Sequence, residues 1–443
     1  MDRPNGPAPA LVRPIVPAAD ALSRWLGFQA LRLACGVFHE GRPAADVIAR
    51  DLTGIRYHDP LTPSTSERDP SVPVSWDEVE SEVGETSVTL RAPNGLERTC
   101  VLHGRYGCVT LPLGVEELDL PYVPAPAREP RTWPLDPNGD VEAAIAPVVA
   151  DGKGRAIVIA HRGRIVGEAY APGFSADSRH SGWSMTKSMV GAMVGRLVHE
   201  GELTVDAPAP IEAWADDARS SITLDHLLRM SSGLDFPIGM SPWAEGIHYS
   251  VYTGLPSVME LAISRPLSAP PGTRCAYANS DPLSAAFIVD QAATRLGIPH
   301  VDVPSTLLYD PLGMDSVALN ADAAGDFILC GQSMATARDW ARFGQLYVDD
   351  GVWDDRRLLP EGWLEYVLTP APADDEPVYG GAFLWLGDRV LPGLPSPCAV
   401  AFGHYGQRTI ILPEQEVVIV RMGHAEDDEL LLGAIARVLD MLA

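Results

Sequence analysis

The chain has 443 residues, of which 46% are hydrophobic and 21% are charged, and its formal net charge is −26. These proportions indicate a globular protein with enough chain for a large core and two or three domains. The acidic excess excludes partners that require a basic surface, so we expect the chain to bind neither nucleic acid nor an anionic membrane.

The first 139 residues predict a tail, a small folded region and a connector. Residues 1–18 are rich in proline and alanine, which predicts a disordered tail, and residues 19–120 predict a small α+β region. Within that region the expected elements are a helix over 19–35, a strand over 35–38, a helix over 43–52, and short strands at 86–90, 99–102 and 108–111. Residues 121–139 are rich in proline and indicate a connector.

Residues 140–443 predict strands at both ends with helices between them. The expected elements are a hairpin at 156–160 and 165–170, helices at 184–200, 223–230, 255–264, 281–296, 302–310, 336–350 and 360–367, strands at 382–386, 409–412 and 417–420, and a last helix at 427–442. An antiparallel sheet that is completed by the returning chain, with a mainly helical subdomain beside it, accounts for this order. We therefore expect an α+β fold, an α/β sandwich.

The cysteines and histidines show no spacing typical of a metal site. The six cysteines lack CxxC pairs, and the two His-Glu pairs at 39 and 199 lack the second histidine of a zinc-binding helix, so we expect neither a metal nor an organic cofactor. The first residues lack the apolar segment of a secretory signal, which predicts a cytoplasmic protein with free thiols. A disulfide between Cys100 and Cys108 is the alternative.

The segment around Ser184 predicts a helix with a reactive first turn. Lys187 follows Ser184 by three positions, so both side chains share one helix face. The start of a helix presents unpaired N–H groups that stabilise negative charge. Burial would strip water from the amine and favour its neutral form, a base. Only Lys153 and Lys187 are lysines, whereas the other basic residues are arginines, which cannot give up a proton.

Two later segments could complete a catalytic site. Tyr277-Ala-Asn279 stands in a loop before a helix, where Tyr277 could carry the proton of Ser184 and Asn279 could either face the substrate or cap the helix. His404-Tyr405-Gly406 forms a turn before an apolar strand. The N–H of Gln407 in that strand could form an oxyanion hole with the N–H of Ser184. The alternative is a glycine-rich bend with an incidental histidine.

An aromatic loop is the candidate for substrate specificity. The loop 235–252 contains Trp243, His248, Tyr249 and Tyr252, which could cover an apolar acyl chain or could only hold the loop in place. Trp183 and Trp385 are further candidates for the wall of the site.

The three motifs Ser-x-x-Lys, Tyr-x-Asn and His-x-Gly, in this order, resemble those of the serine β-lactamase and DD-peptidase superfamily. The likeness covers roughly 139–443 and is greatest with the class C-like branch of esterases, D-aminopeptidases and 6-aminohexanoate-dimer hydrolases. It implies a β-lactamase/transpeptidase-like fold over 140–443 with an N-terminal extension. It also implies a set of roles: Ser184 as nucleophile, Lys187 and Tyr277 as the proton-handling pair, Asn279 as a partner of the substrate or of the hydrogen-bond network, and His404, Tyr405, Gly406 and Gln407 as the third wall of the site.

Two departures from the family pattern narrow the expected substrate. His404 stands where β-lactamases carry a lysine that binds a substrate carboxylate, so efficient β-lactam hydrolysis is not expected. The family's cell-wall enzymes are exported, and this chain shows no export signal, which disfavours peptidoglycan. We expect a small-molecule amide or ester as the substrate, and a homodimer is left open.

Two rival interpretations remain at this point. Gly331-x-Ser333-x-Ala335 is a near match to the nucleophile elbow of an α/β-hydrolase, although the alternating strands and helices of that fold are missing. The other rival is a non-catalytic acyl-binding module that keeps Ser184 on the same fold.

Overall fold

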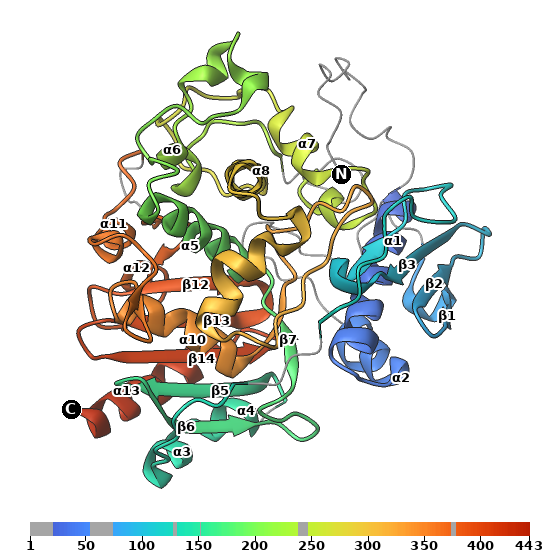
Figure 1. The fold of residues 1–443 in the computed structure, drawn as a ribbon. Helices are drawn as coiled ribbons and strands as arrows, with labels where there is room; N and C mark the ends of the chain where they lie inside the picture. Colours follow the sequence, from blue (N-terminus) through green and yellow to red (C-terminus); the bar gives the residue numbers. More distant parts are fainter. Residues whose placement is uncertain (1–20, 54–73, 127–130, 151, 238–246, 374–377) are drawn as a thin grey trace.

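A computed structural model describes residues 21–53, 74–126, 131–150, 152–237, 247–373 and 378–443 (Figure 1). The expected disordered tail and Trp243 lie outside these ranges. Among the described residues, no helix is both long enough and apolar enough to cross a membrane.

A six-stranded antiparallel sheet forms the centre of the larger part of the chain. Its order is β11-β12-β13-β14-β5-β6, so the last strands pair with the early hairpin and close the sheet. The strands are β5 (Gly154–His161), β6 (Arg164–Tyr170), β11 (Trp385–Leu386), β12 (Ala399–Gly403), β13 (Gln407–Leu412) and β14 (Val417–Gly423). The expected α+β fold with an antiparallel sheet is confirmed.

Alternating side chains of the sheet fill two separate cores. Along β5, Ile157 and Ile159 face one core, whereas Val158 and Ala160 face the other, because successive side chains of a strand point to opposite faces. The first core is covered by α3 (Gly139–Ile145), α4 (Pro147–Ala150) and α13 (Asp428–Leu442). The second is covered by α10 (Ala337–Val348) and α5 (Met185–His199).

The mainly helical part lies beyond α5, on the side away from α13 (Figure 1). It contains α6 (Leu224–Leu228), α7 (Val258–Ile263) and α8 (Ser280–Arg295), and α8 packs against α5. Further along the chain follow the π-helical turn Ser305–Tyr309, α9 (Asp310–Leu312), α11 (Trp363–Leu368) and α12 (Gly387–Val390). A short pair, β7 (Arg179–Ser181) with β8 (Met334–Thr336), was not predicted. It brings the segment before α10 next to the start of α5.

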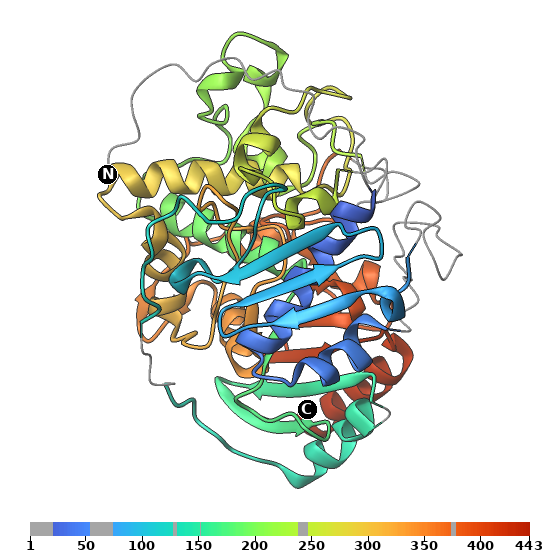
Figure 2. The ribbon, with the colours of Figure 1, turned by 90° about the vertical axis from the view of Figure 1, so that its right-hand side faces the viewer.

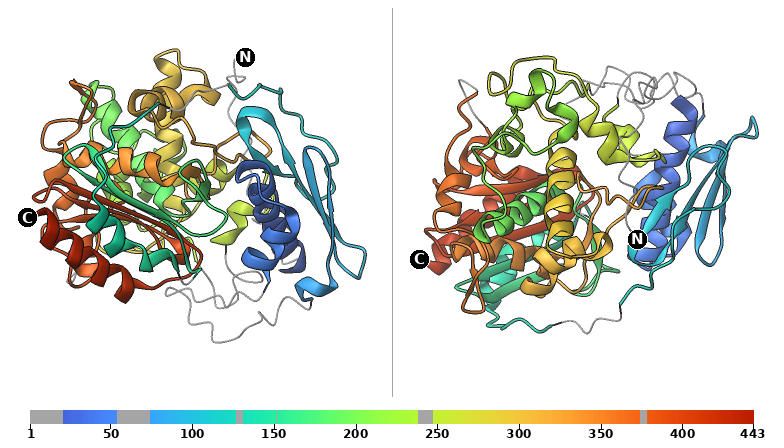
Figure 3. Two further views of the ribbon diagram at one scale, coloured as in Figure 1. Left: turned by 90° about the horizontal axis from the view of Figure 1, so that it is seen from below. Right: turned by 45° about the horizontal axis from the view of Figure 1, so that its top comes forward.

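The N-terminal region forms its own sheet, which faces the viewer in Figure 2. The order is β1-β2-β3-β4, with β1 (Glu80–Val83), β2 (Ser87–Arg91), β3 (Glu97–Leu102) and β4 (Cys108–Thr110). Helix α1 (Ala21–Ala34) lies between this sheet and the rest of the molecule (Figure 3). Its buried side chains, Leu26 and Phe28 among them, belong to the same core as Met185 of α5.

One predicted strand is wrong, and another is confirmed only over its last two residues. The segment expected as a strand at 35–38 instead continues α1 as a π-helical turn, Cys35–His39. Its backbone groups are bonded within the chain segment itself, as in the bond from the Glu40 N–H to the Cys35 carbonyl, so they need no partner strand. Strand propensity alone did not decide the structure of this apolar segment. The segment expected at 382–386 pairs only from Trp385 onward, since Ala382 and Phe383 have positive φ angles of 55° and 59°. Their turn packs against α5, where a Cβ on Gly191 would lie 2.3 Å from the Ala382 carbonyl oxygen.

Candidate active site

Ser184 lies in a tight turn directly before α5. Trp183 adopts a positive φ of 48°, and the N–H of Lys187 bonds to the Ser184 carbonyl at 3.0 Å, so Ser184 is held at the first turn of the helix. A Cβ on Gly182 would lie 2.4 Å from the Trp340 ring, which explains why a glycine precedes the turn. The helix start therefore positions the hydroxyl with little freedom.

Lys187 and Tyr277 both reach the Ser184 hydroxyl. The Lys187 amine donates to Ser184 Oγ at 3.2 Å, and the Tyr277 hydroxyl donates to the same oxygen at 2.5 Å. The Lys187 Nζ also lies 4.8 Å from the centre of the Tyr277 ring, and the lysine side chain is only 2% exposed. Because a hydroxyl both donates and accepts, and an amine accepts when it is neutral, this triangle can carry a proton away from Ser184 and return it.

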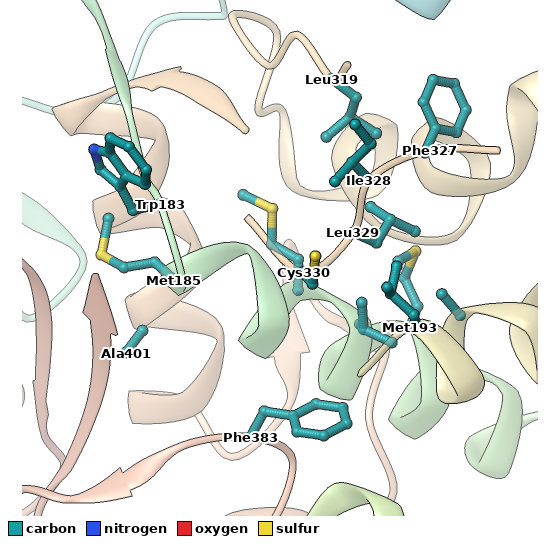
Figure 4. Close-up of a cluster of buried hydrophobic side chains, with 14 of the residues drawn as sticks. Trp183, Met185, Met193, Leu319, Phe327, Ile328, Leu329, Cys330, Phe383 and Ala401 are labelled. Atoms are coloured by element: carbon teal, nitrogen blue, oxygen red, sulfur yellow. The ribbon is translucent and has the colours of Figure 1, made fainter. Parts of the chain in front are cut away.

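A third partner of Lys187 was not predicted. The amine donates to the Cys330 carbonyl at 2.5 Å, from the segment that precedes β8. Backbone carbonyls carry no sequence signature, so only the fold could reveal this contact. The buried apolar shell around the start of α5 includes Met185, Phe383 and Cys330 (Figure 4).

Ser333 of the rival interpretation is buried and already bonded. It is 1% exposed, and its hydroxyl lies 2.7 Å from the hydroxyl of Thr186. The central sheet is antiparallel throughout, whereas a nucleophile elbow belongs to a mostly parallel sheet. The α/β-hydrolase interpretation is therefore wrong about the fold.

An aromatic cavity of about 220 Å³ opens over Ser184. Its wall consists of Trp183, Ser184, His248, Tyr249, Tyr252, Tyr277, Trp385, Val390, Phe402, His404 and Glu426. Most of the candidates for the wall thus lie together around one hydroxyl. Glu426 is the carboxylate in this set, and its side chain is 36% exposed.

The other candidate residues lie behind the wall. Asn279 is fully buried, and its amide donates to the His248 carbonyl at 2.9 Å, so it positions the His248 backbone. The Tyr405 ring packs 5.4 Å from the Trp183 ring, and Tyr405 and Gly406 both have positive φ angles. The Gln407 side chain bonds to Gly423 in both directions.

The turn at 404–407 lies directly beside the Ser184 turn. A Cβ on Gly403 would lie 2.4 Å from the Gly182 carbonyl oxygen, and the His404 ring lies 5.5 Å from the Trp183 ring. Gln407 begins β13 in register with Gly403. The turn before β13 is thus a neighbour of the start of α5, and its His404 lines the cavity together with Ser184.

His248 is a neutral group in the wall. Burial, with smaller contributions from the nearby Lys187 and His404, lowers its pKa from 6.5 to about 3. Its Nδ1 is buried without a hydrogen-bond partner among the described residues. The imidazole can therefore meet a substrate as an uncharged polar group.

The N-terminal region supports this wall, which the sequence did not indicate. The Phe28 ring lies 6.1 Å from the Trp183 ring and 5.8 Å from the rings of both Tyr249 and Tyr252. The apolar spacing of residues 19–35 marks Phe28 as a core residue. However, spacing within one helix cannot indicate which distant surface the helix covers.

Comparison with known proteins gives consistent results. The model of the β-lactamase family matches residues 141–439. The 6-aminohexanoate-dimer hydrolase of Paenarthrobacter ureafaciens is 27% identical over 272 residues, which are 56% of this chain and 67% of that protein. Two solved structures share the fold. One is a family VIII carboxylesterase, with a TM-score of 0.55, 15% identity and coverage of 68% and 96% of the two chains. The other is a penicillin-binding protein from Bacillus halodurans, with a TM-score of 0.51, 16% identity and coverage of 67% and 99%.

Proposed function

Since the chain belongs to the β-lactamase family and is a serine hydrolase, we propose that it cleaves an amide or ester of a small molecule through an acyl-enzyme on Ser184. The observation that carries the proposal is the convergence of Lys187 and Tyr277 on the Ser184 hydroxyl. A neutral amine or a phenolate at these positions accepts the serine proton as the oxygen attacks the carbonyl carbon.

The attack breaks the carbonyl double bond to give a tetrahedral oxyanion. The N–H groups of Ser184 and Gln407 hold this oxyanion, helped by the positive end of α5. As the carbonyl re-forms, Tyr277 protonates the departing amine or alcohol. Water then attacks the acyl-enzyme, the pair Lys187 and Tyr277 takes its proton, and Ser184 is released with the acid product.

The shape and chemistry of the cavity support an apolar acyl chain. Aromatic rings from Trp183, Tyr249, Trp385 and Phe402 line it, and a cavity of about 220 Å³ admits a short linear chain. At the position where β-lactamases carry a lysine that binds the carboxylate of the substrate, this chain has His404, which is not a permanent cation. A linear amide or an ester is therefore favoured over a β-lactam. The relative that hydrolyses a 6-aminohexanoate dimer supports the linear amide.

A hydrolysis panel tests the proposal. It contains p-nitrophenyl esters of increasing chain length, a linear ω-amino-acid dimer, a D-amino-acid amide and a cephalosporin. We expect turnover of an ester or a linear amide, a Ser184 adduct in the intact mass, and loss of both in Ser184→Ala. Full activity in Ser184→Ala would overturn the proposal. A stoichiometric adduct without turnover would instead favour a non-catalytic acyl-binding module.

A further inference from the structure

Three donors for a soft metal ion meet in the N-terminal region, away from the aromatic cavity. The ligand atoms of Cys35, His39 and Cys108 all lie within 4.8 Å of one another. Cys35 and His39 are the two ends of the π-helical turn that follows α1, and Cys108 begins β4. The sequence offered no metal spacing, because the third donor comes from a strand about seventy positions later.

A π-helical turn is an uncommon feature that tends to occur at functional sites. Here it ends α1 and directs a thiol and an imidazole to one point, which Cys108 reaches from the neighbouring sheet. The cluster is enclosed, since Cys35 and Cys108 are 4% and 0% exposed. His39 also lines a separate cavity of about 370 Å³ together with Phe38 and Gly107.

A single amide contacts the side chains of His39 and Cys35 and the backbone of Cys108. The Asn320 Oδ1 lies 3.1 Å from His39 Nε2 and accepts the Cys108 N–H at 3.0 Å, while its Nδ2 donates to Cys35 Sγ at 3.2 Å. Metal-binding residues are commonly oriented by such outer hydrogen bonds, and an N–H directed at a sulfur favours the thiolate. An imidazole can bind a metal with one ring nitrogen while the other keeps its partner.

We propose that Cys35, His39 and Cys108 bind one zinc ion. Thiolate and imidazole donors suit this borderline-soft, tetrahedral ion, and each of the two thiols releases one proton when it binds. The fourth position takes a water molecule from the cavity that His39 lines. Asn320 links this site to the segment before β8, because its Nδ2 also donates to the Gln332 carbonyl at 3.2 Å. Gln332 lies two residues after Cys330, the carbonyl partner of Lys187.

Metal analysis of the full-length, tag-free chain tests this proposal. The protein is purified under reducing conditions, zinc is added, and the unbound zinc is removed by gel filtration. The protein should then retain about one zinc per chain. Exchange for cobalt should give the intense thiolate-to-metal absorption of a tetrahedral site. Cys35→Ser and Cys108→Ser should lose both signals. Cys398→Ser, which removes a buried thiol of the other core, should keep them.

Two further measurements keep the proposal testable if the ligand variants misfold. Asn320→Ala removes none of the three metal ligands, only the amide that orients them. In a chelator competition we expect the zinc affinity of this variant to fall by roughly 10- to 100-fold. Adding zinc should raise the unfolding temperature of the natural chain and of Cys398→Ser. A natural chain that retains no zinc or cobalt would overturn the proposal. So would an unreduced mass that is lower by two hydrogens with a Cys35–Cys108 disulfide.

Discussion

The Tyr277 hydroxyl donates a 2.5 Å hydrogen bond to Ser184 Oγ, although the two residues are 93 positions apart in the chain. The loop before α8 and the turn before α5 therefore have to fold together before the site exists. Because the hydroxyl is the only reactive part of Tyr277 that the proposal uses, the residue can be tested by removing one atom.

Tyr277→Phe keeps the ring that packs against Trp385 and removes the hydroxyl. We expect kcat to fall roughly 10²- to 10⁴-fold, because the serine proton loses its carrier and the leaving group loses its acid. Steady-state hydrolysis of a p-nitrophenyl ester measures the effect. Tyr122→Phe, at an exposed tyrosine, is the control and should leave kcat unchanged. A Tyr277→Phe enzyme with natural kcat would remove the phenol from the mechanism.

The two lysines of the chain form a matched pair for testing proton transfer. Lys187→Arg keeps a positive charge but removes a group that can become neutral, so we expect turnover to fall by at least roughly 10²-fold. Lys153→Arg changes a half-exposed lysine that bonds to Asp427 at 3.1 Å, and it should retain full activity. Circular dichroism of both variants separates loss of chemistry from loss of fold. Retained turnover in Lys187→Arg would contradict the proposed base.

Neutral His248 predicts how stability depends on pH. Its pKa is about 3 in the folded chain and 6.5 in the unfolded chain, so the unfolded state binds more protons between these values and folding weakens as pH falls below 6.5. One such histidine costs about 1 kcal/mol between pH 7.5 and 5.5.

Urea unfolding at the two pH values measures this cost. His248→Phe should lose less stability on acidification than the natural chain, by about 1 kcal/mol. His199→Gln, at an exposed histidine, should lose as much as the natural chain. Equal losses in all three proteins would show that His248 takes up a proton in the folded state.

Gly191 tests the close approach between α5 and the turn at Ala382. A methyl group there would lie 2.3 Å from a backbone oxygen, so Gly191→Ala should destabilise the fold by about 1–3 kcal/mol. Gly139→Ala is the control, because nothing lies within 4 Å of its Cβ position at the start of α3. It should be neutral or slightly stabilising. Urea unfolding of both variants compares them directly, and equal midpoints would mean that α5 can move away from the turn.

The sequence indicated the features that depend on nearby residues and missed those that depend on distant packing. Lys187 follows Ser184 by one helical turn, and that spacing alone predicted their contact. The positive φ angles of Ala382 and Phe383 were hidden, because neither residue type signals a turn. The contact of Phe28 with Trp183 could not be predicted, because it joins two segments that are far apart in the sequence. The apolar spacing in each segment shows which residues are buried but not which distant segment they pack against.

Under the proposed mechanism, that contact would let α1 influence which substrates the cavity accepts. Residues before 141 lie outside the part that the family model matches, yet Phe28 packs against three of the aromatic rings in the cavity over Ser184. A chain truncated to residues 141–443 would keep Ser184, the proposed nucleophile, but would lose the ring that packs behind the cavity. Exchanging the residues before 141 between relatives could therefore change substrate selectivity without changing Ser184, Lys187 or Tyr277.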